Sequence, residues 1–70
     1  MDRVPKGCKY YRIHIGLRGI TCDVTVDFRT PRNDADWKTG NYMSAEEGEL
    51  VRLNIEATIT NKHIRSTTHG

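Results

Sequence analysis

The chain of 70 residues has few cysteines and no long apolar run. Cys8 and Cys22 are its only cysteines, too few for the disulfide framework that holds small secreted domains together. No apolar stretch approaches the ~20 residues of a membrane-spanning helix. The opening Met-Asp-Arg-Val-Pro-Lys has no apolar segment behind it that could act as a signal peptide. We therefore expect a cytoplasmic protein with two reduced thiols.

The chain also lacks an excess of charge of one sign. Its 11 Lys and Arg and 9 Asp and Glu give a net charge of +2 and are interleaved along the sequence, so no strong field of a single sign is expected. A chain of this size forms one domain, here 1–70, that buries only roughly 60% of its unfolded surface. Such domains usually need support from disulfides, a metal or a second copy. We expect the polar ends, about 1–7 and 61–70, to fray.

The strongest positive signal is an alternation of apolar and polar residues in three segments. Alternation of this kind, rich in β-branched residues, is typical of half-buried strands. It predicts an all-β (or β-rich α+β) fold, with a three-stranded antiparallel sheet whose strands span about 9–18, 20–29 and 50–60. The apolar positions are Tyr11, Ile13, Ile15 and Leu17, then Ile20, Cys22, Val24, Val26 and Phe28, then Val51, Leu53, Ile55, Ala57 and Ile59.

The first two segments almost touch in the sequence, which predicts a tight β-hairpin. Gly19 at the junction can take the positive φ that such turns require. Either Leu17 or Ile15 can face Ile20, and both registers keep the apolar side chains on one face of the hairpin.

The third segment carries a competing helical signal, since Ser44 and Glu47 have the spacing of a capping box. At 100° per residue, however, the apolar positions of 50–60 spread around most of a helix, whereas at 180° they share one side. We therefore predict a strand there, and at most one helical turn that begins at Ser44 and ends near Gly48.

The long connection, 30–48, is the best candidate for a functional segment. A connection of this length in a compact domain is usually functional or contains a short element of its own. Four of its residues, Arg32, Trp37, Lys38 and Tyr42, are of types often found at protein interfaces, and we predict that they bind a partner. In the alternative, Trp37 and Met43 fold back as a lid over the sheet.

The apolar face of the predicted sheet is too large for the rest of the chain to cover. Soluble proteins seldom expose apolar patches beyond a few hundred Å². We therefore predict a homodimer, formed by packing two sheets face to face or by pairing two sheet edges. A different partner protein, or a monomer whose connection folds over the sheet, is left open. The residues expected to form this face are Ile13, Ile15, Val24, Val26, Phe28, Leu53 and Ile55.

Catalytic and metal-binding patterns are weak. His14 could approach Asp23 or Asp27 on the polar face of the hairpin, but nothing indicates the oxyanion stabiliser that a hydrolase requires, and an exposed cross-strand polar ladder is the better explanation. The histidines and cysteines lack zinc-site spacing, and Asp34-x-Asp36 departs from a calcium loop at its twelfth position, Ala45. We expect no enzyme activity, cofactor, metal or small-molecule substrate.

Basic and aromatic residues of the first half could stack and neutralise a nucleic acid. Asp23, Asp27 and Glu56 would repel phosphate from the same polar face, and no recognition helix is visible. The sequence therefore favours a non-enzymatic protein-interaction module, a homodimeric accessory or regulatory protein that binds and modulates a larger protein target. The alternative is a small nucleic-acid-binding protein that uses the hairpin and the long loop.

Overall fold

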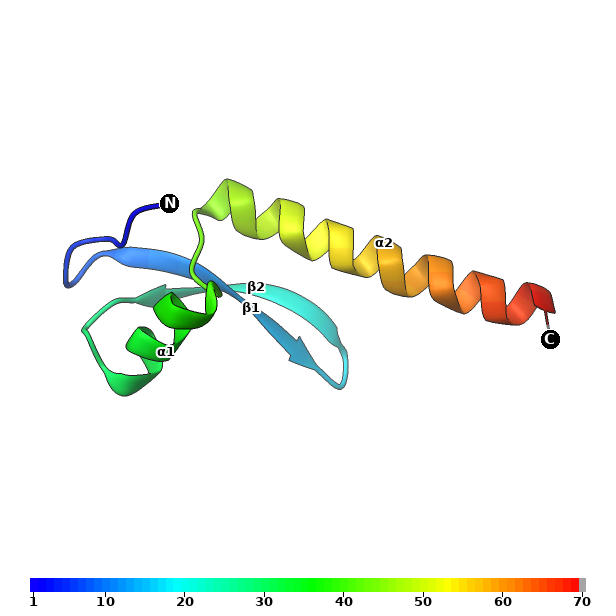
Figure 1. Ribbon diagram of the computed structural model, residues 1–70, viewed down its shortest axis with the longest axis horizontal. Coiled ribbons are helices and arrows are strands. Elements are labelled where there is room, and N and C mark those ends of the chain that lie inside the picture. Colours follow the sequence, from blue (N-terminus) through cyan, green and yellow to red (C-terminus); the bar gives the residue numbers. More distant parts are fainter. Residues whose placement is uncertain (70) are drawn as a thin grey trace.

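The computed structural model contains one β-hairpin and two helices (Figure 1). Its elements are β1 (Lys9–Gly16), β2 (Gly19–Val26), α1 (Pro31–Thr39) and α2 (Ala45–His69). The structure describes the backbone of residues 1–69 and the side chains of residues 1–59. The fold is α+β, so the prediction of a three-stranded, all-β domain is wrong.

The predicted hairpin is confirmed, with shorter strands. Ile15 lies opposite Ile20 and Gly16 opposite Gly19, which leaves a two-residue turn between the glycines. Gly19 has the expected positive φ, 129°. Because residues directly opposite one another share a face, the apolar residues of both strands lie together. This apolar face consists of Tyr11, Ile13 and Ile15 of β1 with Ile20, Cys22, Val24 and Val26 of β2.

The predicted third strand at 50–60 is instead part of α2. The Ser44 and Glu47 side chains cap the start of this helix, because the Glu47 amide donates to Ser44 Oγ at 3.2 Å and the Ser44 amide donates to Glu47 Oε1 at 3.3 Å. Val51, Ile55 and Ile59 recur at a spacing of four, so they share one side of a helix. The spacing of two thus concealed a helical repeat, and the remaining apolar positions of the segment face solvent.

Gly48 continues α2, contrary to the prediction that the helix ends there. A Cβ atom on Gly48 would lie 2.5 Å from Cys22 Sγ and 3.5 Å from Tyr11 Cβ. A side chain at position 48 would therefore require Cys22 or α2 to shift. Since Tyr11 and Cys22 both belong to the apolar face, α2 covers that face (Figure 1).

The connection 30–48 is not a long loop, because α1 and the start of α2 occupy most of it. Thr30 Oγ1 accepts a hydrogen bond from the Asn33 amide at 3.1 Å, and Pro31 takes the first helical position, where its missing N–H costs nothing. Gly40, with φ 82°, ends α1. The helix contacts Tyr10, on the hairpin face opposite α2.

Residues 41–43 join the two helices along the outer edge of β1. Tyr11 and Met43 exchange two backbone hydrogen bonds, both of 2.8 Å. The Asn41 side chain accepts from the Ile13 amide at 2.7 Å and donates to the Ile13 carbonyl at 3.0 Å. The chain therefore passes from one face of the hairpin to the other along the edge of β1. No such segment lines the outer edge of β2 in the described part of the chain.

The molecule is elongated, with extents of 50 × 21 × 18 Å. Its longest axis follows α2, whose 25 residues span about 38 Å at 1.5 Å per residue and run past the tip of the hairpin (Figure 1). The buried apolar side chains of the described residues are few, namely Tyr10, Ile20, Tyr42 and Met43. Neither helix, as far as the structure describes it, is long and apolar enough to cross a membrane.

Candidate interaction surface

The most deeply buried charged group is the carboxylate of Asp27, just after β2, which has no exposed surface. It accepts hydrogen bonds from Arg3 Nε at 2.9 Å, Arg29 Nη1 at 2.5 Å and the Tyr42 hydroxyl at 2.8 Å. These bonds, led by the one from Arg3, hold the pKa of Asp27 well below its usual range. Residues distant in sequence thus meet at one buried carboxylate.

A second polar group lies beside it, around Asp36 of α1. Asp36 Oδ2 accepts from the Tyr10 hydroxyl at 2.6 Å and from Arg12 Nε at 3.0 Å. Asn33 Nδ2 donates to the Tyr10 hydroxyl at 3.0 Å. The rings of Tyr10 and Tyr42 stack with centroids 4.1 Å apart, and this contact joins the two groups into one network.

This network is structural and does not have the features of a catalytic site. Every buried side-chain nitrogen and oxygen atom among the described residues has a hydrogen-bond partner. Burial raises the pKa of Tyr10 and of Tyr42, so neither hydroxyl is a ready base. In the described part of the chain, no three His, Cys, Asp or Glu side chains are grouped to hold a metal ion. The network binds the N-terminal segment, α1 and the hairpin together.

The four residues predicted to bind a partner lie on α1 or just after it, in different surroundings. Arg32 and Lys38 are exposed. Trp37 is 37% exposed and packs edge-on against Tyr42, with ring centroids 5.0 Å apart. Tyr42 is buried and bonded to Asp27. Three of the four therefore reach solvent, while Tyr42 belongs to the core.

The residues predicted to form a dimer face are divided between the hairpin and α2. Ile13, Val26 and Ile55 are half-buried. Four others remain largely exposed, with Ile15 at 67%, Val24 at 53%, Phe28 at 58% and Leu53 at 46%. The helix thus covers the apolar face incompletely, and it carries exposed apolar side chains of its own.

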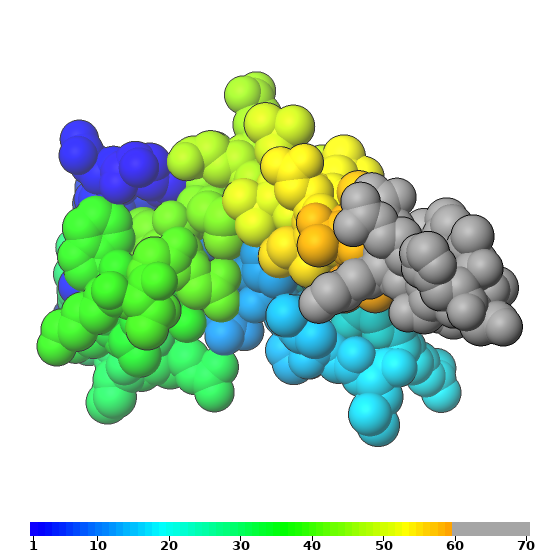
Figure 2. Space-filling view, turned by 45° about the vertical axis from the view of Figure 1, so that its right-hand side comes forward, coloured from blue at the N-terminus to red at the C-terminus, as the bar shows by residue number. Residues whose placement is uncertain are grey.

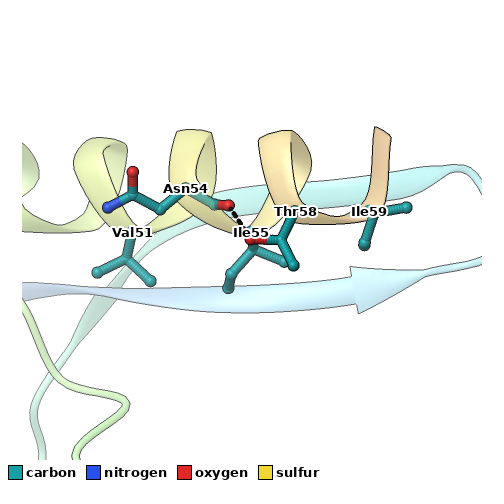
Figure 3. A pocket seen from close by; sticks show the side chains of 5 residues that line it. All are labelled: Val51, Asn54, Ile55, Thr58 and Ile59. Atoms are coloured by element: carbon teal, nitrogen blue, oxygen red, sulfur yellow. Dashed lines mark hydrogen bonds between the residues drawn. The ribbon is translucent and has the colours of Figure 1, made fainter. Parts of the chain in front are cut away.

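An apolar groove of about 320 Å³ runs along one flank of α2. We call it the α2 groove; Val51, Asn54, Ile55, Thr58 and Ile59 line it (Figure 3). Val51, Ile55 and Ile59 point from the helix toward the strands in this view. The Thr58 hydroxyl donates to the Asn54 carbonyl at 2.9 Å, so the lining presents mainly methyl groups. The strand prediction concealed this groove, which only the helical spacing reveals.

A second hollow, of about 390 Å³, lies at the tip of the hairpin. Glu56 of α2 forms one side of it, and the Leu17 side chain at the turn is fully exposed. In Figure 2 the hairpin tip, coloured light blue, lies directly beneath the yellow and orange part of α2. The remaining lining residues are His14, Gly16, Arg18, Gly19, Ile20 and Thr21.

Comparison of the chain with protein-family models, with curated proteins and with solved structures found no match.

Proposed function

We propose that this protein is a non-enzymatic protein-interaction module, an accessory or regulatory protein that binds and modulates a larger protein target. The observation that carries the proposal is the α2 groove, an open apolar groove whose lining residues all belong to the helix. The proposal also includes self-association of the chain.

The exposure of the groove supports a protein as its occupant. Val51 is 36% exposed and Ile59 54%, and Ile15 and Leu17 at the hairpin tip are more exposed still. Exposed apolar residues that lie close together mark protein interaction sites more often than chance surfaces. Complete burial of a fully exposed apolar side chain is worth about 1.5 to 3 kcal/mol, and the partly exposed groove residues would gain a corresponding fraction of this.

The chemistry of the groove also favours a peptide segment over a small polar ligand. No charged side chain lines it, and Asn54 and Thr58 are its polar residues. Its apolar positions follow the helix axis at intervals of four residues, the arrangement by which a helix face packs against apolar partner side chains. The expected occupant is an apolar helix or strand of the target.

Capture from a cell extract tests this proposal. The wild-type protein is compared with a Val51→Ser/Ile59→Ser double variant and with Leu50→Ser, whose exposed side chain lies outside the groove. We expect the wild type and Leu50→Ser to capture the same protein, and the double variant to bind it at least about tenfold more weakly, because each lost apolar contact removes binding energy.

Two results would contradict the proposal. Equal capture by all three proteins would exclude the groove. Capture that disappears after nuclease treatment, or falls steeply between about 50 and 200 mM salt, would favour nucleic acid as the ligand.

A further inference from the structure

The outer edge of β2 carries backbone groups that the hairpin does not use. The N–H and C=O of Tyr11 form their hydrogen bonds with Met43, outside the hairpin. Tyr11 and Val24 therefore form a non-hydrogen-bonded pair of the hairpin, and because such pairs alternate along antiparallel strands, the Cys22 and Ile20 pairs are of the same kind. The N–H and C=O groups of Ile20, Cys22 and Val24 point away from β1.

Nothing in the described part of the chain occupies this edge. No backbone or side-chain hydrogen bond reaches these three residues from outside the hairpin. β2 also lacks the proline, lysine and bulge that usually protect an exposed edge. Its one charged residue, Asp23, turns its backbone groups toward β1. On the other edge of the hairpin, Asn41 and Met43 already occupy the outward backbone groups of Ile13 and Tyr11.

We propose that the β2 edge binds a second copy of this chain, strand to strand and antiparallel, so that two hairpins form one four-stranded sheet. This inference rests on the self-association included in the proposed function and names the surface responsible for it. An edge of free N–H and C=O groups is satisfied by another extended strand, and β2 itself is a suitable one.

The sequence of β2 is complementary to itself about a two-fold axis at Cys22. That axis sets Ile20 of one copy opposite Val24 of the other, so their outward backbone groups meet and the half-exposed Val24 is covered. On the opposite face it sets Thr21 against Asp23, where a hydroxyl can donate to a carboxylate. An axis at Asp23 would instead set two carboxylates directly opposite, which is unfavourable.

The assembly also closes at two copies. In each copy, residues 41–43 occupy the outer backbone groups of Tyr11 and Ile13, so the middle of each outer edge of the four-stranded sheet would be blocked. An isologous interface with its outer edges blocked in the middle favours a dimer over a fibre.

Sedimentation of two matched variants tests this inference. Val24→Pro removes an outward N–H that the hairpin does not use, whereas Val24→Thr keeps the N–H and the β-branched shape. We expect wild type and Val24→Thr to reach twice the chain mass of 8.0 kDa, and Val24→Pro to associate at least about tenfold more weakly. A wild type that stays a monomer at hundreds of micromolar, or a Val24→Pro protein that dimerises normally, would overturn the proposal.

Amide hydrogen exchange of the wild type provides an answer that does not depend on the variants folding. In the dimer, the outward amides of Ile20, Cys22 and Val24 should be as protected as those of Thr21 and Asp23, which donate within the hairpin. Rapid exchange of the outward amides in a dimeric sample would place the interface elsewhere and refute edge pairing.

The outcome is separable from that of the proposed function. A monomeric Val24→Pro protein retains the α2 groove and should still capture the target. If the Val51→Ser/Ile59→Ser variant still dimerises but no longer captures the target, the result bears on the target site and not on the β2 edge.

Discussion

Asp27 is the residue whose role the sequence conceals most completely. In the alternating pattern it is one more polar position after β2, yet its carboxylate is fully buried. Arg29 is its local partner, two residues away, whereas Arg3 and Tyr42 come from distant parts of the chain. Because a buried charge is tolerated only with such partners, and because their meeting depends on the tertiary fold, local pattern could not predict it.

Asp27 makes the stability of the fold decrease at acid pH. The pKa of Asp27 is lower in the folded state than the ordinary value of 3.8. Its contribution to stability is therefore present above about pH 4 and is lost as the pH falls toward the folded-state pKa. We expect a thermal midpoint that is nearly constant from about pH 7 to 5 and decreases below about pH 4. Circular dichroism melts across this range measure it.

The variant Asp27→Asn provides the control for this pH dependence. It should melt at a lower temperature than the wild type at neutral pH, because the arginines lose their charged partner, and its midpoint should fall less steeply in acid. An acid response identical to that of the wild type would show that Asp27 is not the group responsible.

Among the elements, the hairpin was predictable and α2 was not. In the hairpin, the period of two and the glycine turn indicated the same structure, and the apolar face and one of the two expected registers are confirmed. In α2, the same spacing of two coincided with a spacing of four at Val51, Ile55 and Ile59. The cap at Ser44 was identified correctly, but Gly48 was interpreted as a helix end.

Gly48 shows why that interpretation failed, and it allows a test of how α2 packs. An alanine there would gain about 1 kcal/mol of helix propensity, but its methyl group would lie 2.5 Å from Cys22 Sγ, and overpacking costs about 1 to 3 kcal/mol. We expect Gly48→Ala to destabilise the wild type or leave it unchanged, and to stabilise a Cys22→Ala variant by about 1 kcal/mol.

Urea unfolding of the four proteins, wild type, both single variants and the double variant, measures this coupling. If the two substitutions have additive effects, Gly48 does not contact Cys22 and the close approach of α2 is not set by this pair.

At the scale of the whole molecule, the structure changes the reason for expecting a second copy. The sequence predicted a large apolar sheet face without a cover, and α2 of the same chain now covers much of it. What remains is the open edge of β2 and a set of exposed apolar residues. Trp37, predicted either as a lid or as an interface anchor, packs on Tyr42 while part of its surface stays exposed.

Two surfaces are candidates for binding the proposed target, the α2 groove and the exposed residues of α1, Arg32, Trp37 and Lys38. Nuclear magnetic resonance of the labelled protein, titrated with the captured target, distinguishes them most directly. We expect the methyl signals of Val51, Ile55 and Ile59 to shift while the Trp37 indole N–H signal stays in place. A shift of the indole signal with unchanged groove methyls would contradict our proposal that the α2 groove is the binding site.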